Sequence, residues 1–257
     1  MITKKLSIQI ESAIAQSHAS ITKKYEHGQM LKLKYGGAYF SGKESPFSQV
    51  IGWGFDPVDI DMLEPIEAFY LDKGVNICPI ELSAFSGNLM LQKLTDRGYK
   101  CDELNQISIL PMDQYTPVST QNQCIVKHVA KEDLDHWATT IADGFSDHNL
   151  KDIFKLYAMA ENVFAFGAWI DTQLCGGGTI AFSNTVADLG VSSTLPKFRG
   201  QGIQKALLKH RLDFAQKHGI SVASVTTEPG SISDANIQKI GFQPAYTRIK
   251  MQKQLFA

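Results

Sequence analysis

Residues 188–219 read DLGVSSTLPKFRGQGIQKALLKHRLDFAQKHG, and this stretch decides the fold. Residues 186–195 have the composition of a strand, and Ile203, Leu207 and Phe214 then recur at helical spacing. Pro196 and the residues 199–202, RGQG, separate the two patterns. The sequence therefore predicts a strand, a glycine turn and a helix in direct succession.

The glycine turn has the chemistry of a phosphate site. Gly200 and Gly202 let the backbone fold tightly and point successive N–H groups into one concavity. The following helix adds unpaired N–H groups and the positive end of its dipole. Lys197 and Arg199 add positive charge at the rim. A P-loop and a dinucleotide fingerprint are excluded, because Lys205 stands third after Gly202; a G-x-G alone often serves only the geometry of a turn.

The run TLPKFRGQGIQKALL, residues 194–208, resembles the acetyl-coenzyme A signature of the GNAT acetyltransferase superfamily, [QR]-x-x-G-x-[GA] between a strand and a helix. Arg199 and Gly202 match this pattern, whereas Gln204 stands where Gly or Ala is usual. Downstream, residues 229–231 (PGS) and 240–242 (IGF) resemble the superfamily's second coenzyme segment. The resemblance covers the chain from Cys124 onward.

This resemblance implies an α/β fold of mixed, mostly antiparallel sheets with helices on both faces. It also implies an N-acetyltransferase that uses acetyl-CoA as cosubstrate, without metal, and transfers its acetyl group to an amine by direct attack in a ternary complex. The alternative is a noncatalytic acyl-CoA-binding or sensor module, because Ile237 stands where many members carry a tyrosine acid. The residues assigned to the coenzyme are Ser193, Thr194, Leu195, Arg199, Gly200, Gln201, Gly202, Ile203, Gln204, Ser233 and Asn236.

Acetyl transfer needs a held thioester, a donor for the oxyanion and a group that takes the proton of the amine. In the superfamily, free N–H groups of the strand before the turn contact the thioester, which places the amides of Ser193, Thr194 and Leu195 there. Glu228 is the first choice for general base, or else an acid at the start of the next helix. Tyr246 either protonates the leaving thiolate or contacts substrate, or it packs on one face of its strand.

The sequence leaves alternative roles for two further features. The loop 144–148 lies where the superfamily forms its acceptor pocket, so Asp147 and His148 either recognise an amine or serve as base, or they belong to a solvated loop. Ser233 either contacts pantetheine or caps a helix. The acceptor is expected to be a small-molecule or peptide amine.

The composition limits the classes of molecule that we expect the chain to bind. The chain has 257 residues with 25 basic and 26 acidic side chains, and no basic block that would bind nucleic acid. No segment approaches the roughly 20 apolar residues of a membrane span. Near the N-terminus, Gln9, Glu11 and Ser12 interrupt an amphipathic pattern, which argues against a signal peptide and for a cytoplasmic protein. The cysteines lack C-x-x-C spacing, which predicts free thiols without metal. We expect a monomer or a homodimer.

The chain divides into a predicted N-terminal domain, 1–115, and a coenzyme-binding domain, 124–257, joined by a polar linker at 111–123. The first domain is expected to contain helices near 6–24, 60–73 and 88–96, and strands at 29–35, 37–40, 49–55, 76–82 and 102–110. The second is expected to contain helices at 132–142, 150–160, 203–218 and 233–240, and strands at 124–129, 163–170, 174–182, 186–195, 220–227 and 243–252.

An internal repeat connects the two domains. At an offset of 143 residues, 86–87 (SG) align with 229–230 (PG), and 97–99 (RGY) with 240–242 (IGF). The first copy has no G-x-G turn, and carries Asp56, Asp59 and Asp61 where the phosphate turn would be. We interpret it as a degenerate GNAT-like half that cannot hold coenzyme A; chance similarity of two helix–strand units is the alternative.

Overall fold

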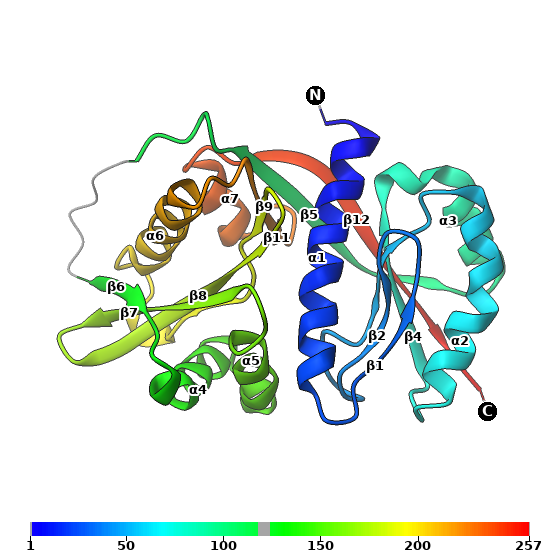
Figure 1. Ribbon diagram of the computed structural model, residues 1–257, viewed down its shortest axis with the longest axis horizontal. Helices are drawn as coiled ribbons and strands as arrows, with labels where there is room; N and C mark the ends of the chain where they lie inside the picture. Colours follow the sequence, from blue (N-terminus) through cyan, green and yellow to red (C-terminus); the bar gives the residue numbers. More distant parts are fainter. Residues whose placement is uncertain (1, 118–123, 257) are drawn as a thin grey trace. The chain divides into compact units, whose positions relative to one another are not determined.

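The computed structural model describes residues 2–117 and 124–256, which form two compact units (Figure 1). Unit 1 comprises Met1–Ser108, Thr226–Asp234 and Pro244–Ala257, and unit 2 comprises Ile109–Val225 and Ala235–Gln243. Segments near the C-terminus therefore belong with the N-terminal unit. The boundaries of 1–115 and 124–257 stay a prediction about the repeat, and residues 118–123 of the predicted linker lie outside the described residues.

Unit 1 is built on a mixed sheet. Its strands are, in spatial order, β1 (Gln29–Lys32), β2 (Gly37–Phe40), β3 (Val50–Trp53), β4 (Ile77–Ser83), β12 (Gln243–Gln254) and β5 (Lys100–Pro111). β3 and β4 are parallel, whereas β4 and β12 are antiparallel. The last strand of the second repeat thus lies beside β4 of the first.

Helices cover both faces of this sheet, namely α1 (Lys4–Lys24), α2 (Leu63–Leu71) and α3 (Gly87–Asp96). Figure 1 shows α1 and α2 on opposite sides of the strands. Alternation along β4 explains the two faces, because Ile80 and Leu82 belong to the apolar core with α2 and α3. Ser83 points the other way, to Ser7 of α1, with 3.2 Å between their hydroxyl oxygens.

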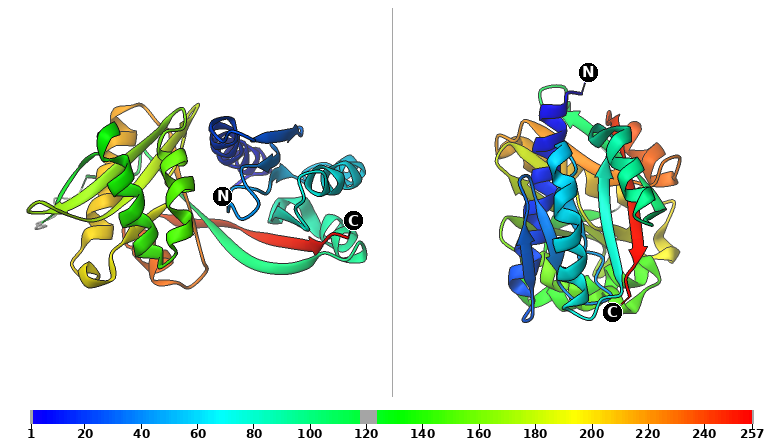
Figure 2. Two further views of the ribbon diagram at one scale, coloured as in Figure 1. Left: turned by 90° about the horizontal axis from the view of Figure 1, so that it is seen from below. Right: turned by 90° about the vertical axis from the view of Figure 1, so that its right-hand side faces the viewer.

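Unit 2 contains both parallel and antiparallel strands. Its strands are, in spatial order, β11 (Val222–Thr227), β9 (Val186–Asp188), β8 (Gln173–Ser183), β7 (Val163–Ile170) and β6 (Ile125–His128), with β10 (Ser192–Thr194) also on β8. Two helices, α4 (Leu134–Phe145) and α5 (Lys151–Ala158), lie on one face, and α6 (Ile203–Lys217) lies on the other (Figures 1 and 2). α7 (Ile232–Gln238) follows β11. The predicted α/β class, with helices on both faces, is confirmed.

One predicted strand, 186–195, is divided in the structure into β9 and β10. Asp188 pairs with Ala181, whereas Ser192 pairs with Gly178, so this chain advances four residues while β8 advances three. The extra residue makes a bulge around Gly190. A Cβ on Gly190 would lie 2.6 Å from the hydroxyl oxygen of Tyr157, which explains the glycine.

Corresponding elements of the predicted repeat share their geometry. β5 (Lys100–Pro111) and β12 (Gln243–Gln254) are offset by 143 residues and are equal in length. The glycines before them, Gly98 and Gly241, both have positive φ, 93° and 111°. These observations support the repeat. No helix among residues 2–117 and 124–256 is both long and apolar enough to cross a membrane.

Candidate active site

The predicted strand, glycine turn and helix are all present in unit 2. β10 leads through a short 3-10 turn (Pro196–Phe198) to Gly200 and Gly202, which both have φ of 78°. Gly202 is the N-cap of α6. An L side chain in this conformation costs roughly 1–2 kcal/mol, which accounts for both glycines.

The start of α6 is open to an anion. Ala206 donates the first intrahelical N–H bond, to Gly202 O at 3.0 Å, so the N–H groups of Ile203 and Lys205 have no helical acceptor. No side chain caps the helix and no acid stands in its first turn. A Cβ on Gly200 would meet no atom within 4 Å. The backbone donors and the free space around them suit a diphosphate.

Arg199 does not lie free at the rim of this turn. Its Nη2 donates to Gly144 O at 2.8 Å, and its Nε donates to Thr194 O at 3.3 Å. Gly144 lies in the last turn of α4, where carbonyl groups carry the negative end of the dipole. The guanidinium therefore fastens the turn to α4, while its coenzyme contact stays a prediction. Gln201 likewise donates to the chain, to Lys197 O at 3.4 Å.

Gln204, the departure from the superfamily pattern, is bound by another predicted site residue. Asn236 Nδ2 donates to Gln204 Oε1 at 2.7 Å. This bond links the first turns of α6 and α7 and holds the glutamine side chain in a fixed place. The side-chain N–H of Asn236 that was predicted for pantetheine is used by Gln204.

The amides of β10 differ in their partners. Leu195 N–H donates to Cys175 O of β8 at 2.9 Å, so the prediction of a free amide is wrong for Leu195. Because antiparallel partners alternate, Ser193 also directs its N–H to β8, and Thr194 directs its N–H to the other edge. Among the described residues β10 pairs with β8 and not with β11, so that edge is open. Of the three predicted amides, only that of Thr194 is available.

A buried charge that the sequence analysis missed supports β10. Arg211 is 1% exposed, and it donates to Thr179 O at 2.8 Å and to Ser192 Oγ at 3.4 Å. A Cβ on Gly178 would lie 2.8 Å from its Nη1, so the strand needs glycine there. Burial lowers the pKa of Arg211 to about 10, which leaves it charged at neutral pH. Its place four residues after Leu207, on the apolar stripe of α6, was the available signal.

The other predicted site residues, Glu228, Ser233 and Tyr246, belong to unit 1. Glu228 is exposed, so the shielding on which its choice as general base rested is missing. Ser233 is the second residue of α7. The capping hydroxyl is instead that of Ser231, which accepts from Asp234 N–H at 3.1 Å.

The side chain of Tyr246 is buried in the interior of unit 1. It is 6% exposed, and its hydroxyl donates to Glu11 Oε1 at 2.7 Å. Burial, and next the Glu11 carboxylate, raise its pKa well above the usual range for tyrosine. The burial and the bond to Glu11 favour the alternative, a strand tyrosine packed on one face, over a role as acid for the thiolate.

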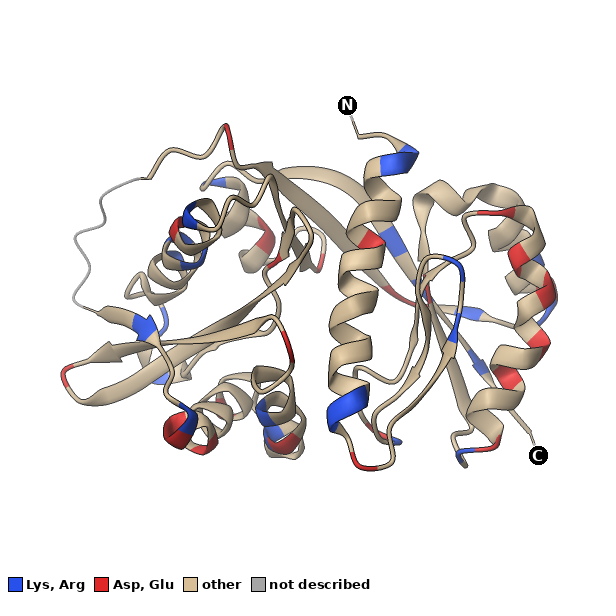
Figure 3. Ribbon diagram, in the orientation of Figure 1, with Lys and Arg blue, Asp and Glu red and all other residues tan. Residues whose placement is uncertain are grey.

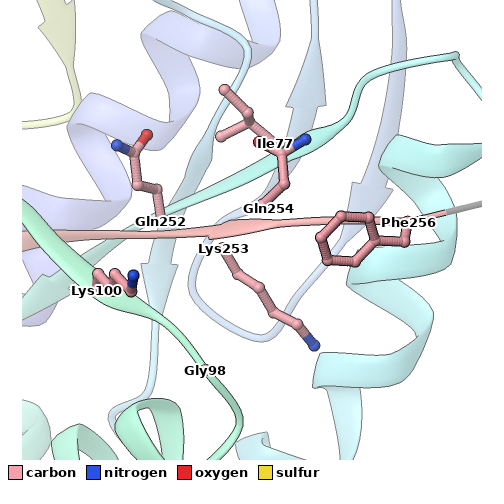
Figure 4. A pocket seen from close by; sticks show the side chains of 7 residues that line it. All are labelled: Ile77, Gly98, Lys100, Gln252, Lys253, Gln254 and Phe256. Carbon is pink, nitrogen blue, oxygen red and sulfur yellow. The ribbon is translucent and has the colours of Figure 1, made fainter.

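A shallow hollow in unit 1 contains none of the predicted site residues (Figure 4). Its volume is about 450 Å³, and it is lined by Ile77, Gly98, Lys100, Gln252, Lys253, Gln254 and Phe256. No group of His, Cys, Asp and Glu within 2–117 and 124–256 could hold a metal ion. All four cysteines are free, but only Cys78 and Cys175 are buried.

Comparisons with known proteins agree with this geometry. Residues 131–242 match the model of the acetyltransferase (GNAT) family. A GCN5-related N-acetyltransferase from Kribbella flavida is similar in structure, with TM-score 0.72, 16% identity and 95% of each chain covered. One from Sphaerobacter thermophilus has TM-score 0.64, 12% identity and coverage of 88% and 76%. A tandem GNAT protein from the clavulanic acid biosynthesis pathway has TM-score 0.61, 10% identity and coverage of 78% and 70%. No curated protein matches the sequence.

The strand, open glycine turn and helix lie in a fold that is similar to that of solved GNAT proteins. The family match lies on that segment and extends from 131 to 242. Residues 131–242 therefore form a region with the sequence features of the GNAT family. The structural likenesses, at 10–16% identity, concern the fold alone.

Proposed function

We propose that the chain binds acetyl-CoA at the start of α6 and transfers the acetyl group to an amine by direct attack in a ternary complex. The observation that carries this proposal is the uncapped start of α6, preceded by two glycines with φ of 78°. The diphosphate would accept from N–H groups of residues 202–205. The open-edge N–H of Thr194 would then be the donor for the thioester oxygen.

A noncatalytic acyl-CoA sensor is the second candidate. Ile237, at the position of the usual tyrosine acid, is 1% exposed, and Tyr246 is bonded to Glu11. With Glu228 exposed, neither residue first chosen for catalysis has an environment suited to it. A binding module would need only the turn and α6.

Two measurements on the full chain distinguish these functions. Calorimetry tests acetyl-CoA binding, and release of the free thiol tests turnover against a panel of small amines and peptides. Thiol release that depends on one amine supports the transferase. Tight binding without turnover on any acceptor supports the sensor, and absence of binding contradicts both.

A further inference from the structure

The loop after α4 has a fixed backbone. Ser146 ends the helix in the left-handed conformation, with φ of 59°. Its N–H donates to Asp143 O at 3.0 Å, and the next N–H, of Asp147, donates to Ala142 O at 3.1 Å. Asp147 in turn accepts from Asn149 N–H at 3.1 Å. The loop is therefore held by its own hydrogen bonds and is not a loosely solvated segment.

This backbone brings an imidazole to a carboxylate. Nδ1 of His148 lies 2.9 Å from Oδ1 of Asp143. That oxygen is shielded from solvent and makes no hydrogen bond within the described parts of the chain, so the 2.9 Å approach of the imidazole is a close contact without hydrogen-bond geometry. The His148 side chain is 83% exposed. The tautomer protonated on Nδ1 is the one that can donate to this carboxylate after a rotation of the ring, and it leaves a lone pair on Nε2.

Gly144, the residue after Asp143, lies against the strand that holds the open amide. A Cβ on Gly144 would fall 2.3 Å from Ser193 Oγ and 3.3 Å from Thr194 N. Ser193 Oγ donates to Ile141 O of α4 at 2.8 Å, and Arg199 donates to Gly144 O at 2.8 Å. The residue between Asp143 and the loop is thus packed directly on β10.

We propose that His148 is the general base of the acyl transfer and that Asp143 positions it, an inference that rests on the proposed function. Nε2 of neutral His148 takes one proton from the ammonium group of the acceptor. The freed nitrogen lone pair attacks the thioester carbon, a C–N bond forms, and collapse of the adduct breaks the C–S bond. Of the two protons lost by nitrogen, one reaches the leaving thiolate and the other leaves through His148 to solvent.

The neighbouring charges favour a cationic acceptor. Asp143 and Asp147 place two carboxylates on this loop, and the acidic and basic positions of α4 and α5 are interspersed (Figure 3). Two cations of this region have partners: Arg199 donates to Gly144 O, and Lys151 lies 3.7 Å from Asp135. A protonated primary amine would meet the carboxylates of Asp143 and Asp147 beside the base.

The test compares His148→Gln with His136→Gln, an exposed histidine of α4. A lost general base lowers kcat/KM about 100-fold and removes the acidic limb of its pH profile, while calorimetric affinity for acetyl-CoA is unchanged. Asp143→Asn should lower kcat about tenfold with the KM for acetyl-CoA unchanged. Added imidazole should restore part of the activity of His148→Ala. His136→Gln should behave as wild type.

The outcomes separate this inference from the proposed function. If wild type turns over an amine and His148→Gln does so equally, with the same pH profile, the inference fails and the transferase stands. A wild type that binds acetyl-CoA but acetylates no amine overturns both. A thermal melt of each variant confirms the fold, which the exposed imidazole should not disturb.

Discussion

Each unit has a turn that leads from a strand into a helical segment, and the two turns differ in whether their N–H donors already bind a carboxylate. In unit 1, the carboxylate of Asp59 accepts from the N–H groups of Gly54 at 3.1 Å and Asp56 at 3.0 Å. In unit 2, the start of α6 has no side-chain cap and no acid. The first turn already contains its own anion, whereas the second leaves its donors for a ligand.

The comparison shows how little separates a closed turn from an open one. The surrounding elements are retained: β5 and β12 are equal in length, and Gly98 and Gly241 share a positive φ. Core positions are fixed by packing in both copies, for example Tyr99 and Phe242, each 2% exposed. Loops lack this packing constraint, so a single acidic side chain in a loop can take the place of a bound anion.

Closing the open turn with an acid should have the largest effect. Gly202→Glu puts a carboxylate beside the first N–H groups of α6 and a side chain where φ is 78°. Coenzyme affinity should fall more than 1,000-fold, which is about 4 kcal/mol, because the anion site is blocked and repulsive. Calorimetry with acetyl-CoA measures this loss.

Gly219→Glu is the matched control for that variant. Gly219 follows the same helix at its other end, has φ of 70°, and has open space around it. Both variants should lose about 1–2 kcal/mol of unfolding free energy from backbone strain. Only Gly202→Glu should lose the coenzyme, and retained affinity in that variant would exclude the turn as the binding site.

Lowering the pH should decrease the stability of unit 1 more than that of unit 2. Burial lowers the pKa of His18 to about 4, and its ring nitrogens contact Ile14 O and the side chain of Gln49. In the unfolded chain a histidine titrates near 6.5, so the unfolded state binds more protons between these values. The free energy of unfolding should therefore decrease by about 3 kcal/mol as pH falls from 6.5 to 4.

Hydrogen exchange measured separately over the two units tests this difference. His210 of unit 2 is only half-buried, and burial lowers its pKa without moving it as far. Protection in α1 should decrease before protection in α6. His18→Gln should flatten the pH dependence, whereas the exposed His27→Gln should preserve it. Equal loss of protection in both units would contradict the assignment to His18.

Removing the internal anion of unit 1 should have a smaller effect. Asp59→Ala leaves the N–H groups of Gly54 and Asp56 without their acceptor. The unfolding free energy from urea titration should fall by about 1–2 kcal/mol. Asp61→Ala, at an exposed acid in the same segment, should change it little. If Asp59→Ala is as stable as Asp61→Ala, the two backbone bonds do not close the turn.

The periodicity of apolar residues predicted the helices and strands, because each pattern reflects the buried face of one element. The helix predicted at 203–218 is observed as Ile203–Lys217, and the strand predicted at 243–252 as Gln243–Gln254. The break between β9 and β10 was missed, since a bulge changes register without changing the alternation of residue types. Nor did local patterns indicate that β12 would lie beside β4, because strand pairing depends on distant residues.

The site was predictable where backbone conformation demands a residue type. Gly200 and Gly202 require glycine, and the sequence states this directly. Side-chain roles depended on partners far along the chain: Arg199 bonds Gly144, and Tyr246 bonds Glu11. Such contacts join residues that are far apart in the sequence, so the motifs alone did not predict what these side chains bind.

The smallest effect should come from restoring the superfamily pattern in the open turn. Gln204→Ala removes a side chain that Asn236 holds at 2.7 Å, so coenzyme affinity should change less than about threefold, or about 0.7 kcal/mol. A double-mutant cycle with Asn236→Ala should give a coupling of about 0.5–1.5 kcal/mol in stability, the net value of one hydrogen bond. A tenfold gain in affinity for Gln204→Ala would mean instead that the glutamine obstructs the diphosphate. The turn of unit 2 would then be partly closed, and the contrast with Asp59 would be one of degree.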